Sequence, residues 1–280
     1  MFNRGGGRGG FGGARLLIAL VVAAFALFRY LSSSQVNPVT GEKQRVGDIS
    51  PQQEIALGLQ ALPSLERQYG GLSGDPRGQA VVDRIGARIV QGSDAAKSPY
   101  RYQFHLLNDP ETINAFALPG GQVFITSGLM RRLRSEGEVA GVLGHEVGHV
   151  VARHGAEHIA KQQLSQGLTG AAVLATYDPN NPNSYKSAAV LQMISGLVNL
   201  KYGRSDELEA DRLGVRLIAE AGYDPRALIG VMEVLQKAAA GKGRQPEFFS
   251  SHPNPENRVA KIKEAIAQQF SGGVPAGLER

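Results

Sequence analysis

Hydrophobic and polar positions follow two different periods along this chain, and the change from one to the other predicts where helices and strands lie. Apolar residues recur at helical spacing within residues 51–69 and 76–91, and again along nearly all of the chain after residue 128. Between these stretches, YRYQFHLL at 100–107 is typical of a strand, and TINAFAL and QVFITSG flank a Pro-Gly-Gly turn as the two arms of a hairpin. The pattern therefore predicts an α+β fold that is mainly helical.

An apolar run stands near the N-terminus, behind a glycine-rich cationic leader. Residues 16–28, LLIALVVAAFALF, match the hydrophobic core of a signal peptide, but they fall short of the roughly 20 apolar residues of a full membrane span. Arg29 could extend its charge to the membrane surface and Tyr30 could lie at that surface, which lengthens the usable segment. We therefore expect residues 1–35 to be a leader and a membrane anchor. A signal cleaved near residues 32–34 is the alternative.

The positive charge of the chain is concentrated in the same segment. The formal net charge is +5, and four of these charges belong to arginines within residues 1–35, which contain no acidic residue. The rest of the chain is nearly neutral, so we expect no nucleic-acid partner; RNA binding by the short Arg-Gly leader is a weaker alternative. Arginines before an apolar segment favour a cytoplasmic N-terminus. The body would then be held to the inner membrane on its outer side, in the cell envelope, or be soluble in the periplasm after signal cleavage.

The remaining segments divide into a linker, one large body and a tail. Residues 36–50 are typical of a linker, residues 51–270 contain the periodic segments, and residues 271–280 are expected to be a flexible tail. Within the body, the polar segment 177–185 is a loop between two apolar runs, TGAAVLAT and AAVLQMISGLV. These runs are too short for membrane spans, so we expect a helical hairpin that packs over the core, touches the bilayer or partly covers a cleft.

The segment GHEVGH at 144–149 lies on a helix that we expect to be buried. Ser135 and Glu138 have the spacing of a capping box, so the helix is predicted to begin there. His145 and His149 are one turn apart and lie within about 40° of each other on one face. The opposite face is apolar, which indicates burial.

This spacing of two histidines and a glutamate is typical of zinc hydrolases. Two imidazoles on one helical face can bind one metal ion, and Glu146 beside them can reach a water molecule without binding the metal. Because the chain contains no cysteine, thiolate zinc sites and cysteine nucleophiles are excluded. A chance match is the alternative, and burial of the helix favours a real site.

A catalytic zinc ion needs a third protein ligand, and the acidic segment GRSDELEAD at 203–211 offers two candidates. On a helix, Glu207 and Asp211 lie on one stripe within about 40°, while Glu209 points about 160° away. With Glu207 as the ligand, Asp211 one turn behind it could accept the outer N–H of a ligand histidine. Taken alone, however, the segment fits the solvated acidic start of a helix at least as well.

Four motifs in order resemble metallopeptidase family forty-eight, the gluzincins that include the CAAX prenyl proteases, the HtpX-like proteases and exported bacterial members. They are NAFALPGG at 114–121, GHEVGH at 144–149, RSDELEAD at 204–211 and SHPNPENR at 251–258. The similarity spans about residues 50 to 265. A glycine at position 203, where members often carry serine, is a small departure.

The resemblance implies a zincin-like metalloprotease domain with a small β-sheet or hairpin beside the HExxH helix. It implies one Zn²⁺ per chain, held by His145, His149 and Glu207, with Asp211 supporting a ligand histidine. Glu146 would take the proton of the attacking water and pass it to the leaving amine. The implied activity is that of a zinc endopeptidase, and the family suggests misfolded or unassembled envelope proteins as substrates.

The resemblance also implies a substrate-binding strand and a further active-site residue. A polypeptide substrate would pair in extended form with the strand that contains Asn114, Ala115, Phe116 and Ala117. His252 would lie near the zinc ion, where it could stabilise the oxyanion or bind the metal. If His252 closes the metal site, the alternative function is a zinc-stabilised chaperone or peptide-binding module without turnover.

Three other histidines are expected to lie outside the site. His154 and His158 are four residues apart, but they should face about 180° away from the GHEVGH pair, so packing or surface exposure is favoured over a second metal site. His105 lies in a predicted strand and is expected to be structural. The sequence predicts no oligomeric state.

Overall fold

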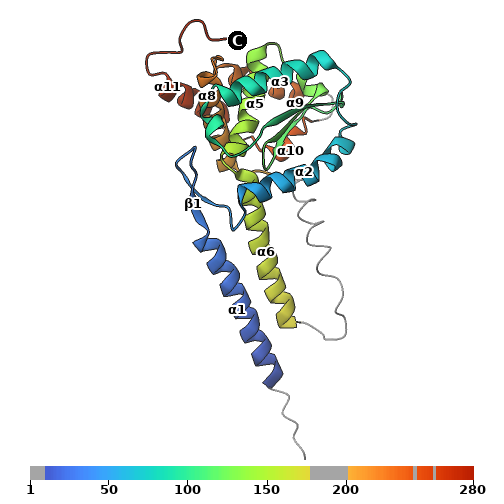
Figure 1. Cartoon of the computed structure of the whole chain (residues 1–280), viewed down its shortest axis with the longest axis vertical. Coiled ribbons are helices and arrows are strands. Elements are labelled where there is room, and N and C mark those ends of the chain that lie inside the picture. The colour runs from blue at the N-terminus through green and yellow to red at the C-terminus, as the bar shows by residue number, and fades with distance from the viewer. Residues whose placement is uncertain (1–9, 177–200, 242–244, 255–256) are drawn as a thin grey trace, which may run out of the picture.

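The structure is a computed structural model that describes residues 10–176, 201–241, 245–254 and 257–280. Most elements form one body, and two long helices project from it side by side as a stalk (Figure 1). The helices are α1 (Gly10–Ser32), α2 (Pro51–Gln68), α3 (Pro76–Gln91), the 3-10 helix η1 (Asp94–Lys97), α4 (Ser127–Met130), α5 (Glu136–Val151), α6 (His154–Thr176), α8 (Arg204–Glu220), α9 (Ala227–Ala240), α10 (Phe248–Ser251) and α11 (Arg258–Gln269). The strands are β1 (Ser34–Val36), β2 (Lys43–Arg45), β3 (Gln103–Leu107), β4 (Ala115–Leu118) and β5 (Gln122–Thr126).

The body is a mainly helical α+β fold, as the hydrophobic pattern predicts. The helices expected within residues 51–69 and 76–91 are α2 and α3. Each begins with a proline behind a polar cap: the side chain of Ser50 accepts a hydrogen bond from the backbone of α2, and that of Asp75 accepts one from α3. A cap satisfies a backbone N–H that the helix leaves free, and proline has no N–H to lose in the first turn.

Three strands form the sheet of the body in the order β3-β5-β4. β3 is parallel to β5 and β4 is antiparallel to it, so the predicted hairpin is confirmed. The turn of this hairpin requires glycine. Gly120 and Gly121 both have positive φ, and a Cβ on Gly120 would lie 2.4 Å from Cα of Ile55 in α2.

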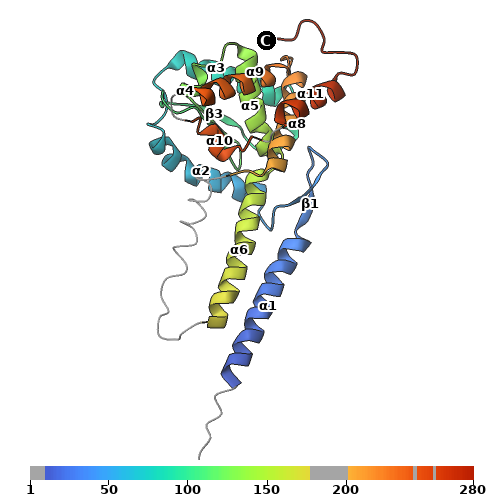
Figure 2. The same ribbon diagram turned by 180° about the vertical axis from the view of Figure 1, so that it is seen from behind.

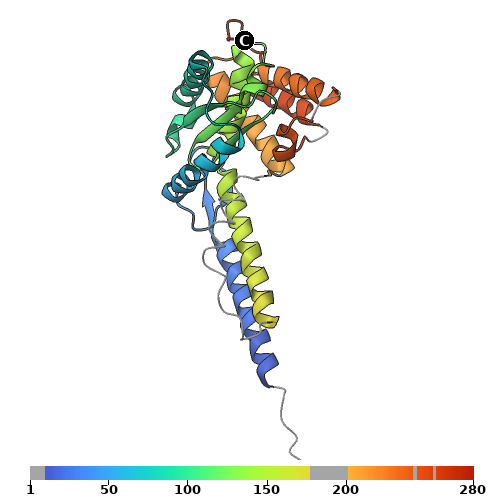
Figure 3. The same ribbon diagram turned by 90° about the vertical axis from the view of Figure 1, so that its right-hand side faces the viewer.

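The central helix of the body is α5, whose residues from Gly137 to Val151 are all buried. It contacts β4, α8 and α9, and Figure 3 shows it between the sheet and the orange and red C-terminal helices, which Figure 2 shows from behind. Two glycines of α5 allow this close packing. A Cβ on Gly144 would lie 2.3 Å from a methyl carbon of Ile218, and one on Gly148 would lie 2.9 Å from the carbonyl oxygen of Ala210. The glycines of GHEVGH therefore bring α8 and its acidic segment against the two histidines of α5.

The stalk consists of α1 and α6, which run in opposite directions beside each other in all three views. The apolar run 169–176 does not pack over the core, because α6 carries it away from the body, whereas its contact with a bilayer stays a prediction. Gly167 of α6 lets the two helices approach, because a Cβ added at this position would lie only 3.0 Å from Cβ of Ala26. The second apolar run, 188–198, and the loop 177–185 lie outside the described residues.

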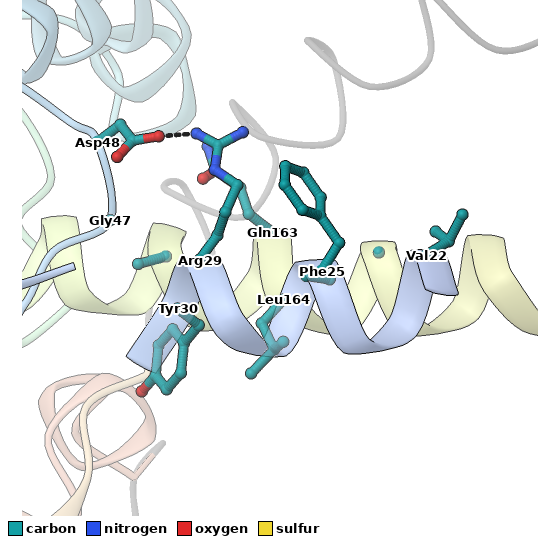
Figure 4. A pocket seen from close by; sticks show the side chains of 11 residues that line it. Val22, Phe25, Arg29, Tyr30, Gly47, Asp48, Gln163 and Leu164 are labelled. Carbon is teal, nitrogen blue, oxygen red and sulfur yellow. Dashed lines mark ion pairs between the residues drawn. The ribbon is translucent and has the colours of Figure 1, made fainter. Parts of the chain in front are cut away.

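The stalk meets the body around a cavity of about 270 Å³ (Figure 4). Phe25 of α1, Leu164 of α6 and Gly47 are among the residues that line it. Arg29 also lines the cavity and forms an ion pair with Asp48. The charge of Arg29 therefore ties the end of α1 to the segment before α2.

The outer face of α1 is apolar and exposed to solvent in the single chain. Phe28 is 67% exposed and Leu17 is 64% exposed, although large apolar side chains are normally buried. Within the described part of the chain, no helix is both long enough and apolar enough to cross a membrane. The exposed large apolar side chains of α1 are Leu16, Leu17, Ile18, Leu20, Val21, Phe25, Leu27, Phe28 and Leu31.

The segments expected to be a linker and a flexible tail both contact the body. Between α1 and α2, β1 and β2 pair with each other, and the side chain of Asn37 donates to the carbonyl oxygen of Val151 at 2.7 Å. At the C-terminus, Glu279 forms a β-bridge with Tyr223 and an ion pair with Arg88. These are contacts between residues far apart in sequence, which composition does not reveal.

Candidate metal centre

The helix that carries GHEVGH begins where the sequence predicts. Ser135 is the N-cap of α5, and its hydroxyl accepts a hydrogen bond from the backbone N–H of Glu138 at 3.2 Å. The other half of the predicted capping box differs, since the Glu138 carboxylate accepts from the backbone N–H of Arg134 at 2.6 Å. The resulting α5 presents His145 and His149 one turn apart, with ring centroids 4.7 Å from each other.

Four buried side chains converge at this point of α5. His145 and His149 belong to α5, Glu207 to α8, and His252 directly follows α10; one nitrogen or oxygen of each lies within 4.8 Å of the others. Nε2 of His145 is 3.1 Å from Nε2 of His149. The two carboxylate oxygens of Glu207 lie 3.6 Å and 3.5 Å from these two nitrogens. Imidazole nitrogens and a carboxylate at such separations can bind one metal ion together.

The two candidate glutamates of α8 point to different places. Glu207 is fully buried and faces the histidines of α5. Glu209 lies outside this group, and its Oε2 is 3.4 Å from Nε2 of His154. In the structure, Glu207 therefore belongs to the cluster, whereas Glu209 lies outside it and contacts His154.

Asp211 lies behind His145, one helical turn after Glu207. Its Oδ1 is 3.0 Å from Nδ1 of His145, and Arg258 donates to both of its carboxylate oxygens at 2.7 Å and 2.9 Å. Burial alone would raise the pKa of Asp211, but Arg258 and His145 hold this pKa below its usual range. An ionised Asp211 accepts the Nδ1–H of His145, which leaves the lone pair of Nε2 directed at the cluster.

Arg258, the first residue of α11, links the two carboxylates of α8. Besides binding Asp211, its NH1 lies 3.0 Å from Oε2 of Glu207, and its side chain is only 1% exposed. A buried guanidinium is tolerated only beside compensating negative charge. Arg258 therefore holds both carboxylates in place and offsets part of their charge.

Glu146 lies beside the cluster without belonging to it. Its side chain is fully buried, and neither of its carboxylate oxygens has a hydrogen-bond partner among the described residues. Burial raises the pKa of Glu146 to about 8, and a nearby cation would lower this pKa by favouring the carboxylate. An unpaired carboxylate in this position can accept a proton from a water molecule.

The unpaired polar atoms of the cluster fit a bound cation. Oε1 of Glu207 and Nε2 of His252 are buried without a hydrogen-bond partner in the described part of the chain, and Oε2 of Glu207 has the charge of Arg258 3.0 Å away; such burial is costly. Burial also lowers the pKa of His145, His149 and His252, which favours the neutral imidazole that binds metals. Three imidazoles and one carboxylate form a donor set that suits a transition metal ion such as Zn²⁺.

The strand expected to bind substrate lies next to the cluster, but its outer edge is covered. The backbone N–H of Phe248 donates to the carbonyl oxygen of Ile113 at 3.1 Å, and the hydroxyl of Tyr202 lies 3.5 Å from the carbonyl oxygen of Ala117. Within residues 114–117, only the side chain of Phe116 is partly exposed. The conformation described here is therefore closed to a peptide at this edge.

Sequence reasoning missed Tyr202, which packs directly against the cluster. Its ring stacks on the imidazole of His149, with centroids 3.8 Å apart and an interplanar angle of 21°. Its backbone N–H donates to the carbonyl oxygen of Ser251 at 3.0 Å. The sequence could have pointed to Tyr202 through its position immediately before GRSDELEAD, because a residue that directly precedes the helix of a candidate ligand lies close to that ligand.

The expectation that His154 faces away from the site is wrong. It assumed one continuous helix, whereas α5 ends at Val151 and α6 begins at His154. The turn brings Nδ1 of His154 to 2.8 Å from Nδ1 of His149. The other two histidines lie outside the cluster, where His158 contacts Gln162 and His105 contacts Gln122.

Comparisons with known proteins agree with this arrangement of motifs. The model of Peptidase family M48 matches residues 76–266. The Beta-barrel assembly-enhancing protease of Escherichia coli K12 is 30% identical over 261 residues, which cover 90% of this chain and 52% of that protein. The Mitochondrial metalloendopeptidase OMA1 of Schizosaccharomyces pombe is 31% identical over 241 residues, which cover 85% of this chain and 68% of that protein.

These matches differ in how much of each relative they include. The chain spans about half the length of the E. coli relative, 52%, and about two thirds of the yeast relative, 68%. The Metalloprotease YcaL of E. coli K12 is 30% identical over 176 residues, which cover 63% of this chain and 66% of that protein. Because the family model matches more than half of the chain and includes the HExxH helix and α8, this protein belongs to peptidase family M48.

Proposed function

We propose that this protein is a zinc-dependent endopeptidase. His145, His149 and Glu207 would hold one Zn²⁺ per chain, which leaves a fourth position for water or substrate. The observation that carries this proposal is the buried group of metal-binding side chains with the unpaired carboxylate of Glu146 beside it. The names of the relatives, which are proteases, support the same reaction class.

The proposed roles of the residues follow from their contacts. Zn²⁺ bound there would supply a Lewis acid that polarises the scissile carbonyl and acidifies the attacking water. Glu146 takes the proton of this water and passes it to the leaving amine. Asp211 keeps Nε2 of His145 available for the metal, and Arg258 orients Asp211. Burial excludes bulk water, which strengthens each of these interactions.

The substrate would bind as an extended strand along the outer edge of β4, at residues 114–117. β4 pairs with β5 on one side, so its other side can offer main-chain hydrogen bonds to a peptide. Phe248 and Tyr202 contact that side in this conformation, and the peptide must displace them. Main-chain pairing demands little of the substrate sequence, which suits a protease that acts on unfolded segments.

Two roles of His252 correspond to two tautomers of its ring. The hydroxyl of Ser251 lies 2.9 Å from Nδ1 of His252 and 3.3 Å from the carbonyl oxygen of Phe248, and it has one proton to donate. If it donates to Nδ1, then Nε2 of His252 carries a proton and can stabilise an oxyanion. If it donates to Phe248, then Nδ1 carries the proton and the bare Nε2 can bind metal.

A zinc-stabilised chaperone or peptide-binding module is the second candidate function. The position of His252 within the cluster favours it, because a fourth protein ligand would close the metal site. The unpaired Glu146 favours turnover instead, because a purely structural site has no use for a buried base. Hydrolysis by the unmodified protein would exclude the second candidate.

We propose that the substrates are misfolded or unassembled proteins of the cell envelope. The E. coli relative is named for enhancing β-barrel assembly, which supports this class of substrate. The exposed apolar face of α1 supports attachment to the inner membrane, and the arginines that precede its apolar run support a position of the body on the outer side. A soluble periplasmic form that follows cleavage of the N-terminal segment is the alternative.

The direct test is cleavage of casein or another unfolded protein by the purified chain, with and without a zinc chelator. We expect cleavage that the chelator abolishes and that added Zn²⁺ restores. Cleavage that survives complete removal of metal would contradict the proposal, and so would a zinc-loaded protein that never cleaves any unfolded substrate.

A further inference from the structure

A strained turn separates α5 from α6 at the candidate metal centre. Arg153 in this turn has a φ of 56°, a left-handed conformation that a residue with a Cβ adopts at an energetic cost. Its guanidinium donates to the Glu54 carboxylate at 2.9 Å and to the carbonyl oxygen of Ile49 at 2.8 Å. Both charged side chains are largely buried, at 10% and 2% exposed. A strained residue held this firmly indicates that the turn serves to position a neighbour.

The neighbour that the turn positions is His154. Its ring folds back against His149, with Nδ1 of one 2.8 Å from Nδ1 of the other. On the opposite side of the ring, Nε2 of His154 lies 3.4 Å from Oε2 of Glu209. The side chain of His154 is 2% exposed, so water does not compete for these contacts.

If His149 binds Zn²⁺ as proposed, these distances determine which ring nitrogens of His149 and His154 carry a proton. In that site His149 binds the metal through Nε2, so its proton is on Nδ1. This Nδ1–H can donate only if Nδ1 of His154 carries no proton. The proton of His154 is then on Nε2, which faces the carboxylate of Glu209.

We infer that His154 is a positioning residue of the metal centre, which accepts the outer N–H of His149 as Asp211 accepts that of His145. The inference rests on the proposed function, because it needs His149 to be a metal ligand. Each ligand histidine then has its own acceptor: a carboxylate of α8 for His145, and an imidazole supported by Glu209 for His149. Without His154, the Nδ1–H of His149 would be buried without a partner and its ring would be free to rotate.

The experiment measures zinc affinity in the full chain, by competition with a chromophoric chelator, for three variants. In His154→Asn, the side-chain amide oxygen can occupy the place of Nδ1, so the acceptor is retained. In His154→Ala the acceptor is removed. His158→Ala is the matched control, since this histidine lies one turn further along α6 and contacts Gln162 instead of the site. Absorption spectra of the Co²⁺-substituted proteins report the geometry of the metal directly, and thermal melting with excess chelator reports the fold without metal.

We expect His154→Ala to weaken zinc binding by about 10- to 100-fold and to change the Co²⁺ spectrum, as loss of a partner of a ligand histidine does elsewhere. His154→Asn should recover most of the affinity, and His158→Ala should match the unmodified protein. Equal zinc affinity of His154→Ala and the unmodified protein would overturn the inference. So would equal losses in His154→Ala and His154→Asn, which would reduce His154 to a packing residue.

If His154→Ala fails to fold, His154→Gln replaces it in the comparison. A glutamine amide reaches the place of Nε2 rather than Nδ1, so it should bind zinc more weakly than His154→Asn, and equal affinities would contradict the inference. Failure of the proposed function itself has a different signature, because the unmodified protein would then bind no zinc or cleave nothing.

Discussion

His252 and Glu146 face each other at the candidate metal centre: Nε2 of His252 lies 3.5 Å from Oε1 of Glu146, and both side chains are fully buried. They lie more than 100 residues apart in sequence: Glu146 belongs to the central helix α5, and His252 directly follows the short helix α10. A proton acceptor and an imidazole at this distance can both contact one small reacting group.

Replacement of His252 by alanine distinguishes a catalytic role of this residue from a role as the fourth protein ligand that closes the metal site. If His252 donates to the oxyanion, His252→Ala should lower kcat by about 100-fold or more, with little change in KM or zinc content. If His252 binds the resting metal instead, the same change should leave activity intact or raise it, because the fourth position opens to water. Steady-state kinetics with metal analysis decides between them, and a loss confined to thermal stability would make His252 structural.

Replacement of Glu146 by glutamine should abolish peptide hydrolysis while zinc stays near one ion per chain. Glutamine keeps the shape of the side chain but cannot take the proton of water. Zinc content after gel filtration and cleavage of an unfolded protein are the two measurements. Substantial remaining turnover would remove Glu146 from the role of base, and loss of zinc would mean that it binds the metal.

Replacement of the two glutamates of α8 by alanine should have very different effects. Glu207→Ala should sharply weaken zinc binding, since the carboxylate of Glu207 lies 3.5–3.6 Å from Nε2 of both histidines. Glu209→Ala should weaken it far less, because Glu209 reaches the cluster only through His154. Metal content after dialysis tests this ranking, and the reverse order would mean that the ligand is misassigned.

Replacement of Asp211 by asparagine should weaken zinc affinity or activity by about 10- to 100-fold. The substitution removes the negative charge that accepts the Nδ1–H of His145 and that binds Arg258. Zinc affinity and kcat/KM of Asp211→Asn are the readouts. Unchanged values for both would show that Asp211 serves the fold and not the metal.

The body of the protein should be found outside the cytoplasm and attached to the membrane. The basis is the apolar face of α1, with Phe28 67% exposed, behind a cationic leader. Fractionation combined with protease protection is the measurement. A soluble cytoplasmic protein would contradict this prediction, whereas a membrane-free form that begins near Gln35 would indicate a cleaved signal.

The features that depend on local geometry could be predicted from the sequence alone. Helical periodicity predicted α2 and α3, the Pro-Gly-Gly turn predicted the β4–β5 hairpin, and Ser135 predicted the start of α5. The spacing of His145 and His149 places them on one face of any helix. These inferences hold because each involves residues within a few turns of one another, where backbone geometry leaves few choices.

The residues that surround these two histidines are brought there by the packing of distant segments. Glu207 reaches them because glycines let α8 approach α5, while Tyr202 and Phe248 cover the edge of β4 from distant segments. These are contacts between residues far apart in sequence, which local periodicity does not define.

The position of His154 depends on the left-handed backbone conformation of the preceding residue, Arg153. The left-handed turn at Arg153 moves His154 from the far side of a presumed continuous helix to the back of His149. Arg153 keeps this strained conformation because Glu54, about 100 residues earlier in the chain, holds its side chain. A local pattern does not contain such a distant partner, so the sequence predicted the two candidate metal-binding histidines but not the residues that orient them.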